Sequence, residues 1–97
     1  MDSLTLTRRF VISGSVQGVG YRMFAVHAAS ERGLAGYVRN LRDGRVEVYA
    51  AGPPAQLAAL RADLQRGPRA ARVTSFTEQD APLRAEYSSS FSIEFDR

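Results

Sequence analysis

The chain contains no cysteine, no lysine and no tryptophan, and His27 is its single histidine. The lack of cysteine excludes disulfide scaffolds, thiolate nucleophiles, zinc ribbons and iron–sulfur clusters. The lack of lysine excludes a Walker-type phosphate lysine, a Schiff-base lysine and a lysine general base. One histidine cannot form a multi-histidine metal site. The composition therefore rejects more reaction types than it suggests.

The length and composition describe one small globular domain. The 97 residues suffice for one compact domain, and 44% apolar and 24% charged residues argue against disorder. The net charge of +3 favours anionic partners, but the arginines are spread along the chain among Asp and Glu, unlike a nucleic-acid-binding tail. No apolar run approaches the roughly 20 residues of a membrane span, and signal-peptide features are missing. We expect a soluble cytoplasmic protein with one domain over residues 1–97, in which residues 1–7 form a loosely ordered tail.

Hydrophobic periodicity predicts the order strand, helix, strand, strand, helix, strand and a final short strand. The expected elements are strands over 10–12, 34–41, 45–51 and 73–77, helices over 21–32 and from 53 to 67, and a last strand with residues 91, 93 and 95 on one face. This order indicates an α+β, ferredoxin-like split βαβ sandwich, with two helices on one face of an antiparallel sheet. The expected core includes Tyr21, Phe24, Leu57, Leu60 and Leu64, and the expected solvated arginines are Arg61, Arg66, Arg69 and Arg72.

The segment from Gly14 to Arg22, GSVQGVGYR, places a glycine-rich turn and a helix start directly after the first strand. Glycines allow successive backbone N–H groups to point into one concavity, and the helix start adds donors with partial positive charge. Arg22 brings a forked cation, so the segment can form a cradle for a dianionic phosphoryl group. Its spacing fits neither a dinucleotide fingerprint nor a Walker loop. The alternative is that the glycines serve only the turn and that Arg22 is a solvated surface residue.

This segment resembles the signature of acylphosphatases, small ferredoxin-like enzymes that hydrolyse the mixed anhydride of a carboxylic acid and phosphate. A second motif of that family, a Gly-aromatic-Val-basic-Asn run before a hairpin, is matched by residues 36–40, GYVRN. The closing segment 87–93, YSSSFSI, is similar to the last strand of the family. The likeness extends from about Arg8 to Phe95 in the family's element order.

The resemblance implies that Arg22 and Asn40 are the catalytic residues, Arg22 binding the phosphate and Asn40 positioning the attacking water. The implied phosphate-binding set is Ser15, Val16, Gln17, Gly18, Val19, Gly20 and Arg22. The side-chain chemistry agrees, because a guanidinium binds two phosphoryl oxygens bidentately and an amide orients water without titrating. The alternative for Asn40 is a residue that merely ends a strand before a hairpin.

The implied reaction is metal-independent hydrolysis of acyl phosphates to a carboxylate and inorganic phosphate, with no metal site and no cofactor. The leaving carboxylate is a weak base and departs without a general acid, and we hypothesise that a substrate phosphate oxygen accepts the water's proton. His27 lies away from the apolar stripe of its helix, so we interpret it as solvent-facing rather than as a base. The expected partner is a small-molecule acyl phosphate, phosphate or sulfate can occupy the site, and we expect a monomer that binds neither nucleic acid nor membrane.

Two other functions remain as hypotheses. RNA-recognition domains share this architecture, and residues 32–37, RGLAGY, begin like their basic, Gly, aromatic motif. However, Leu34 and Gly36 stand where the stacking aromatics belong. A non-catalytic anion-binding domain that keeps the phosphate cradle is the third hypothesis.

Overall fold

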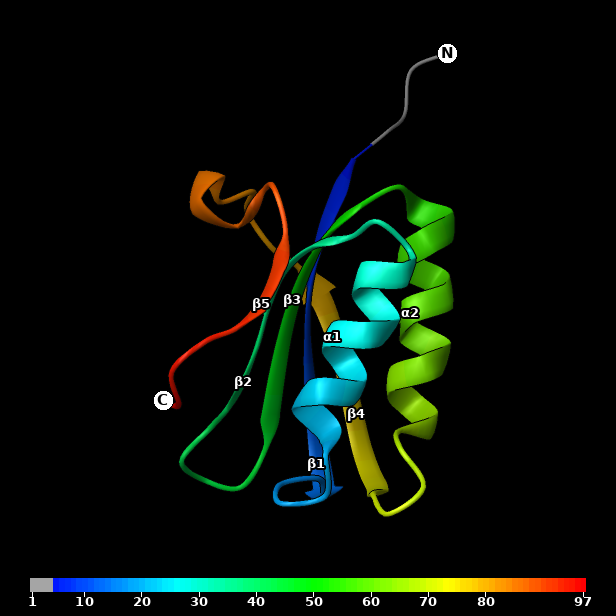
Figure 1. Cartoon of the computed structure of the whole chain (residues 1–97), viewed down its shortest axis with the longest axis vertical. Helices are drawn as coiled ribbons and strands as arrows, with labels where there is room; N and C mark the ends of the chain where they lie inside the picture. The colour runs from blue at the N-terminus through cyan, green and yellow to red at the C-terminus, as the bar shows by residue number, and fades with distance from the viewer. Residues whose placement is uncertain (1–4) are drawn as a thin grey trace.

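The computed structural model describes residues 5–97, and residues 1–4 lie outside the description. The elements follow the predicted order (Figure 1). They are β1 (Leu6–Ser15), α1 (Tyr21–Glu31), β2 (Ala35–Asn40), β3 (Val46–Gly52), α2 (Pro54–Arg66), β4 (Arg72–Asp80), the short 3-10 helix η1 (Ala85–Tyr87) and β5 (Phe91–Ile93). Neither α1 nor α2, in this described part of the chain, is long and apolar enough to cross a membrane.

The five strands form one sheet in the order β4-β1-β3-β2-β5, and both helices lie on the same face of it (Figure 1). The pairs β1–β3, β1–β4 and β2–β3 are antiparallel, which confirms the predicted α+β ferredoxin-like arrangement. The expectation of an antiparallel sheet is wrong for its last strand, because β5 pairs parallel with β2. The connection after β4 crosses to the other edge of the sheet and reverses the direction of the chain, so β5 runs antiparallel to β4. Since β2 is also antiparallel to β4, β5 is parallel to β2.

The core lies between the sheet and the two helices. The stripe of Leu57, Leu60 and Leu64 on α2 is buried, as predicted from its helical spacing. Tyr21 is also buried, and its hydroxyl donates to the Leu64 carbonyl at 2.6 Å, which joins the start of α1 to the end of α2. Phe24, by contrast, is only half-buried.

The first strand is longer than predicted. Leu6 and Thr7 were expected in a loose tail, but they belong to β1 and pair with Gly52 and Ala51 of β3. This part of the tail prediction is wrong because β3 extends far enough to offer these residues backbone partners. Thr5 is exposed and lies outside the strand, and residues 1–4 of the predicted tail lie outside the described residues.

The last strand is shorter than predicted. β5 ends at Ile93, and Phe95, which was expected to share a face with Phe91 and Ile93, is 90% exposed. Phe91 alone of the three is buried. The end of the chain therefore displays apolar side chains instead of burying them.

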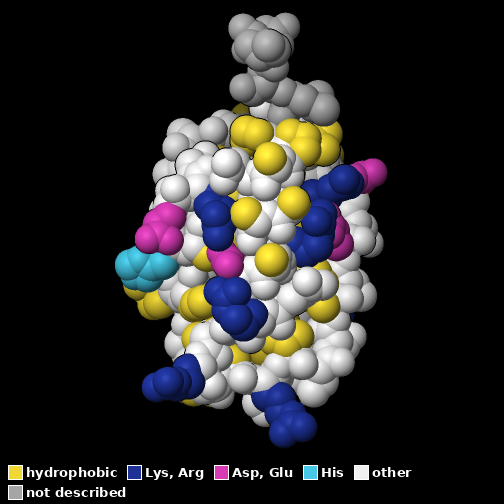
Figure 2. Space-filling model, turned by 90° about the vertical axis from the view of Figure 1, so that its right-hand side faces the viewer, with side chains coloured by type: hydrophobic (Ala, Val, Ile, Leu, Met, Phe, Trp, Pro, Cys, Tyr) yellow, Lys and Arg dark blue, Asp and Glu magenta, His cyan; other side chains and the backbone are white. Residues whose placement is uncertain are grey.

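Many of the arginines that give the chain its positive charge are paired with carboxylates. Figure 2, which views the molecule from the side of α2, shows basic side chains separated by acidic and apolar ones. Arg61 was expected to be solvated, but it is half-buried and holds Glu78 through two donors. Asp63 likewise accepts from Arg32 and Arg66. This face therefore has no concentrated basic tract.

The sheet face opposite the helices carries an aromatic cluster. The rings of Tyr37 and Tyr49 stack at 5.3 Å between centroids, and Tyr87 of η1 packs against both. The Tyr49 hydroxyl donates to the Pro82 carbonyl and accepts from the Arg84 amide, which fixes the β4–β5 connection across this face. Tyr37 and Tyr49 are nearly fully buried, so neither ring forms an open platform for stacking bases.

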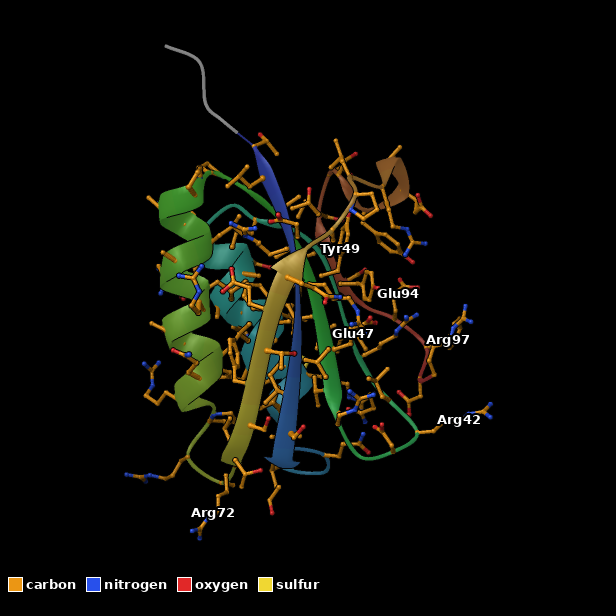
Figure 3. All side chains as sticks on the ribbon, turned by 180° about the vertical axis from the view of Figure 1, so that it is seen from behind. Arg42, Glu47, Tyr49, Arg72, Glu94 and Arg97 are labelled. Atoms are coloured by element: carbon orange, nitrogen blue, oxygen red, sulfur yellow. The ribbon has the colours of Figure 1, made fainter. Side chains whose placement is uncertain are left out.

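The carboxylate of Glu47 is buried beside this cluster and is fully engaged (Figure 3). It accepts hydrogen bonds from Arg9 and from the Tyr37 hydroxyl (3.1 Å), and Arg39 Nε lies 2.5 Å from its Oε1. Burial by itself would raise the pKa of Glu47. The hydrogen bond from Arg9, the charges of Arg39 and Arg9 and the hydrogen bond from Tyr37 together outweigh burial and lower this pKa below its usual value.

Because the pKa of Glu47 is lower in the folded than in the unfolded chain, its stabilising contribution is complete above the unfolded pKa, about 4.3. That contribution disappears as the pH falls through the folded pKa. Glu47→Gln should lower the free energy of unfolding at pH 7 by about 3 kcal/mol, the cost of breaking a largely buried ion pair. Urea denaturation should show a much smaller difference from wild type near pH 3. Glu31→Gln, on the exposed side of α1, is the control, and an equal loss for Glu47→Gln at both pH values contradicts the assignment.

Candidate active site

The loop over residues 16–20 carries the chain from the end of β1 into α1. Val16 is buried and anchors the loop to the core, whereas Gly18 and Gly20 have φ of +75° and +82°. Space around both glycines is open, so the backbone conformation rather than a close contact favours glycine there. Gly20 is the N-cap of α1. The first N–H groups of the helix, which have no partner within the helix, therefore lie directly at the end of this loop.

The side chain of Gln17 ties this loop to the β2–β3 hairpin. Its Nε2 donates to the carbonyls of Leu41 (2.8 Å) and Arg45 (2.9 Å), which flank the hairpin turn. Leu41 itself donates from its amide to the Arg45 carbonyl at 2.8 Å. The loop before α1 is thus connected to the segment that directly follows Asn40.

Strand register places Asn40 next to the same loop. Val46 of β3 pairs with Ile12 of β1 on one side and with Asn40 of β2 on the other. The loop therefore leaves β1 only a few residues beyond the level at which β2 ends. Arg22, in the first turn of α1, lies over this end of the sheet.

A cavity of about 220 Å³ opens where the loop, the start of α1 and the end of β2 meet. It is lined by Val16, Gly18, Gly20, Tyr21, Arg22, Met23, Asn40 and Ile93. Arg22 and Asn40, which belong to separate motifs of the sequence, consequently face one cavity. The backbone of the loop and the N-terminal end of α1 form another part of its wall.

Arg22 is half-exposed, and its guanidinium also reaches the C-terminal segment. Its Nη1 donates to Asp96 Oδ1 at 3.4 Å, and the two side chains are 41% and 58% exposed. A guanidinium has five N–H donors, so one contact with a carboxylate leaves several donors for an anion in the cavity. The site is therefore electropositive through Arg22 and the helix start.

Asn40, at the end of β2, is a buried polar side chain. It is 9% exposed, and its backbone carbonyl accepts from the Arg97 amide at 3.0 Å. Its side-chain Oδ1 is buried and accepts no hydrogen bond from the residues that the structure describes. A buried oxygen without a partner is costly, so its position next to the cavity points to a ligand or a water as the donor.

The structure brings only part of the predicted phosphate-binding set to the cavity. Val16, Gly18, Gly20 and Arg22 line it, together with Asn40. Ser15 instead ends β1 opposite Arg72, the Gln17 side chain is directed at the hairpin, and Val19 packs against the core. Met23 and Ile93, which were not among the predicted site residues, also line the cavity.

His27 lies outside this site. It is exposed on α1 and does not line the cavity, which confirms that it faces the solvent. Within residues 5–97, three or more His, Cys, Asp or Glu side chains do not come together in a way that could hold a metal ion. The groups that line the cavity are thus a guanidinium, an amide, a tyrosine, backbone and apolar side chains.

The fold and this cavity define a small α+β domain with an arginine and an asparagine beside a glycine-rich loop. The family model "Acylphosphatase" matches residues 8–93. An acylphosphatase of Solibacter usitatus is 57% identical over 76 residues, which cover 78% of this chain and 79% of that protein. One of Koribacter versatilis is 52% identical over 81 residues, which cover 84% and 74%. The crystal structure of acylphosphatase from Bacillus subtilis superimposes with a TM-score of 0.86 at 36% identity, over 92% of this chain and 98% of that one.

The chain therefore belongs to the acylphosphatase family. It is a hydrolase that splits acyl phosphates into a carboxylate and inorganic phosphate, and its substrate is a small molecule.

The two hydrogen bonds from Gln17 to the hairpin should contribute to the rate of hydrolysis. Gln17→Ala removes both hydrogen bonds from the loop to the hairpin, so the loop and Asn40 lose their fixed relation. We expect kcat/KM for acetyl phosphate to fall about tenfold, because small displacements of positioned groups are costly to the rate. Gln79→Ala, at an exposed position of β4, is the matched control. Equal rates for Gln17→Ala and wild type would show that the two Gln17 hydrogen bonds have no part in catalysis.

Proposed function

We propose that Arg22 and the loop amides bind the phosphoryl group of the substrate and that Asn40 orients the water that attacks it. The observation that carries this proposal is that Asn40, whose buried Oδ1 has no partner among the described residues, lines the same cavity as Arg22. An oxygen acceptor beside a cationic, amide-rich pocket suits a water that is held next to a bound phosphoryl group.

Phosphoryl binding uses charge that the site holds in place before the substrate arrives. The Arg22 fork can donate to two phosphoryl oxygens, and the amides at the start of α1 add a partial positive charge. Gly18 and Gly20 let the loop backbone approach the anion because no side chain intervenes. The same donors offset the negative charge on the phosphoryl oxygens during transfer.

The water is positioned by an amide that cannot titrate. Asn40 Oδ1 accepts one proton of the water in a hydrogen bond and thereby turns an oxygen lone pair towards phosphorus. Because the side chain is held at the end of β2 by backbone pairing with Val46, this orientation costs little at the moment of reaction.

The reaction balances without an acid or a base from the protein. The water oxygen forms a bond to phosphorus, and the bond between phosphorus and the carboxylate oxygen breaks with its electron pair going to the carboxylate. The water's proton passes to a phosphoryl oxygen. A carboxylate is a stable leaving group, so the step needs neither a general acid nor a metal to assist departure, and we expect the rate to persist in the presence of a chelator.

Arg22→Ala and Asn40→Ala should each lower kcat/KM for acetyl phosphate by about 100- to 1,000-fold, as loss of one oriented charge-stabilising or positioning group does in comparable enzymes. Phosphate release, measured with a chelator present, gives the rates. Arg69→Ala, at an exposed position outside the cavity, is the control for arginine loss. Asn40→Ala should leave the free energy of unfolding within about 1 kcal/mol of wild type, because the lost oxygen had no partner among the described residues.

A wild type that binds phosphate without turnover would instead favour a non-catalytic anion-binding domain. Unchanged rates for Arg22→Ala or Asn40→Ala would show that these residues are wrongly assigned.

His27→Gln should leave the pH–rate profile unchanged, because the imidazole is exposed on α1 and does not face the cavity. The measurement is kcat/KM for acetyl phosphate between pH 5 and 9 for the variant and wild type. A profile in which one limb disappears would identify the imidazole as a proton acceptor.

The monomeric state, location in the cytoplasm and independence of nucleic acid stay predictions from the sequence. The burial of Tyr37 and Tyr49 beneath the β4–β5 connection supports the last of these, because RNA-recognition domains of this architecture need open aromatic rings on that face.

A further inference from the structure

Exposed apolar side chains gather at the mouth of the active-site cavity. The large hydrophobic side chains exposed in the described part of the chain are Met23 (52%), Leu83 (61%), Ile93 (41%) and Phe95 (90%). Met23 and Ile93 line the cavity itself, and Phe95 lies just beyond Ile93. Only Leu83 of the four is remote, in the connection between β4 and β5. Such a concentration on a small domain marks a surface that binds something apolar.

A second, larger hollow adjoins the phosphoryl site. It measures about 540 Å³ and is lined by Arg22, Ile93, Glu94, Phe95 and Asp96. Arg22 and Ile93 therefore belong to the walls of both cavities. A group attached to a phosphoryl held by Arg22 can extend from the smaller cavity into the larger one along Ile93 towards Phe95.

The segment that carries Phe95 is fixed relative to Asn40 by backbone hydrogen bonds. The Glu94 amide donates to the Val38 carbonyl at 2.9 Å, and the Arg97 amide donates to the Asn40 carbonyl at 3.0 Å. The Arg42 amide donates in turn to the Arg97 carbonyl at 2.5 Å. Phe95 is thus held between two anchored residues, close to the strand that ends in Asn40. Figure 3 shows Arg42 and Arg97 near each other at this edge of the molecule.

The hollow also carries negative charge. Asp96 contacts Arg22 with one carboxylate oxygen, and Glu94 contributes to the same wall. An acyl group that bears its own anionic charge would approach the Asp96 carboxylate and be repelled. A neutral apolar acyl group meets no such penalty and covers exposed hydrocarbon on Ile93 and Phe95.

We propose that Ile93 and Phe95, with Met23 at the cavity mouth, form the binding surface for the acyl part of the substrate, and that Asp96 selects against anionic acyl groups. The enzyme accordingly favours acyl phosphates with a neutral apolar acyl group. This inference rests on the proposed phosphoryl site, because the position of the acyl group follows from a phosphoryl held by Arg22.

The test compares kcat/KM for benzoyl phosphate with kcat/KM for acetyl phosphate, whose acyl group offers far less apolar surface. The ratio of the two should fall about three- to tenfold in Ile93→Ser and in Phe95→Ser, since a partial apolar contact is worth the lower end of hydrophobic discrimination. Phe95→Leu should restore most of the ratio. Leu83→Ser, which removes the remote exposed hydrophobic side chain, is the matched control and should leave the ratio at the wild-type value.

A second pair of variants tests the role of the Asp96 charge. Asp96→Asn should raise kcat/KM for succinyl phosphate, whose acyl group carries a carboxylate, at least threefold relative to acetyl phosphate. Asp43→Asn, at the exposed hairpin turn outside both hollows, should leave that ratio unchanged. An unchanged ratio in Asp96→Asn overturns the role of Asp96.

The outcomes separate this inference from the proposed function. A wild type that hydrolyses neither acetyl nor benzoyl phosphate contradicts the function itself. Active Ile93→Ser and Phe95→Ser variants with the wild-type ratio overturn only the acyl-binding surface. A wild-type dimer that Phe95→Ser converts to a monomer, with the ratio unchanged, would likewise overturn it and assign the surface to a second copy of the chain.

Discussion

The pairing of Val46 with both Ile12 and Asn40 is the constraint on which the active site depends. A central strand with a neighbour on each side fixes the level at which each neighbour ends, and a shift of one residue would turn every core side chain outwards. Val46 and Ile12 are fully buried against the helices, so the hydrophobic core locks this register. The loop that follows β1 and the amide that ends β2 are placed side by side as a consequence.

Two buried polar side chains on neighbouring strands, Glu47 and Asn40, differ in whether their oxygens have partners. Glu47 has its charge answered by Arg9, Arg39 and the Tyr37 hydroxyl, so both of its carboxylate oxygens have partners. Asn40, which lies beside it in the sheet, keeps a buried acceptor without a partner among the described residues. Natural proteins tolerate an unsatisfied buried group mainly where function needs it, and this contrast supports the proposal that Asn40 rather than Glu47 meets the substrate.

The sequence was sufficient for the element order because short apolar strands, leucine spacing and glycine stops are local signals. The two motifs also pointed to Arg22 and Asn40, which the structure brings to one cavity. The side-chain direction of Gln17 could not be predicted, since its partners lie on a hairpin distant in sequence and no local pattern encodes that contact. The same reason explains why Ile93 was missed at the cavity: its position depends on the parallel pairing of β5 with β2, which only the long connection after β4 makes possible.

No carboxylate or imidazole of the described residues lines the cavity, and this changes where selectivity can arise. In the proposed mechanism the leaving group departs unaided and the proton stays on the substrate, so Arg22, Asn40 and the loop amides would act only on the phosphoryl group and the water, which all acyl phosphates share. Nothing in that set distinguishes one acyl group from another. Discrimination must therefore come from residues beyond the phosphoryl site, and the wall that adjoins it is built by the last residues of the chain, Ile93 to Asp96. Those residues reach the site because the segment after β5 continues along β2, so the parallel strand that departs from the antiparallel pattern also carries the proposed acyl-binding surface.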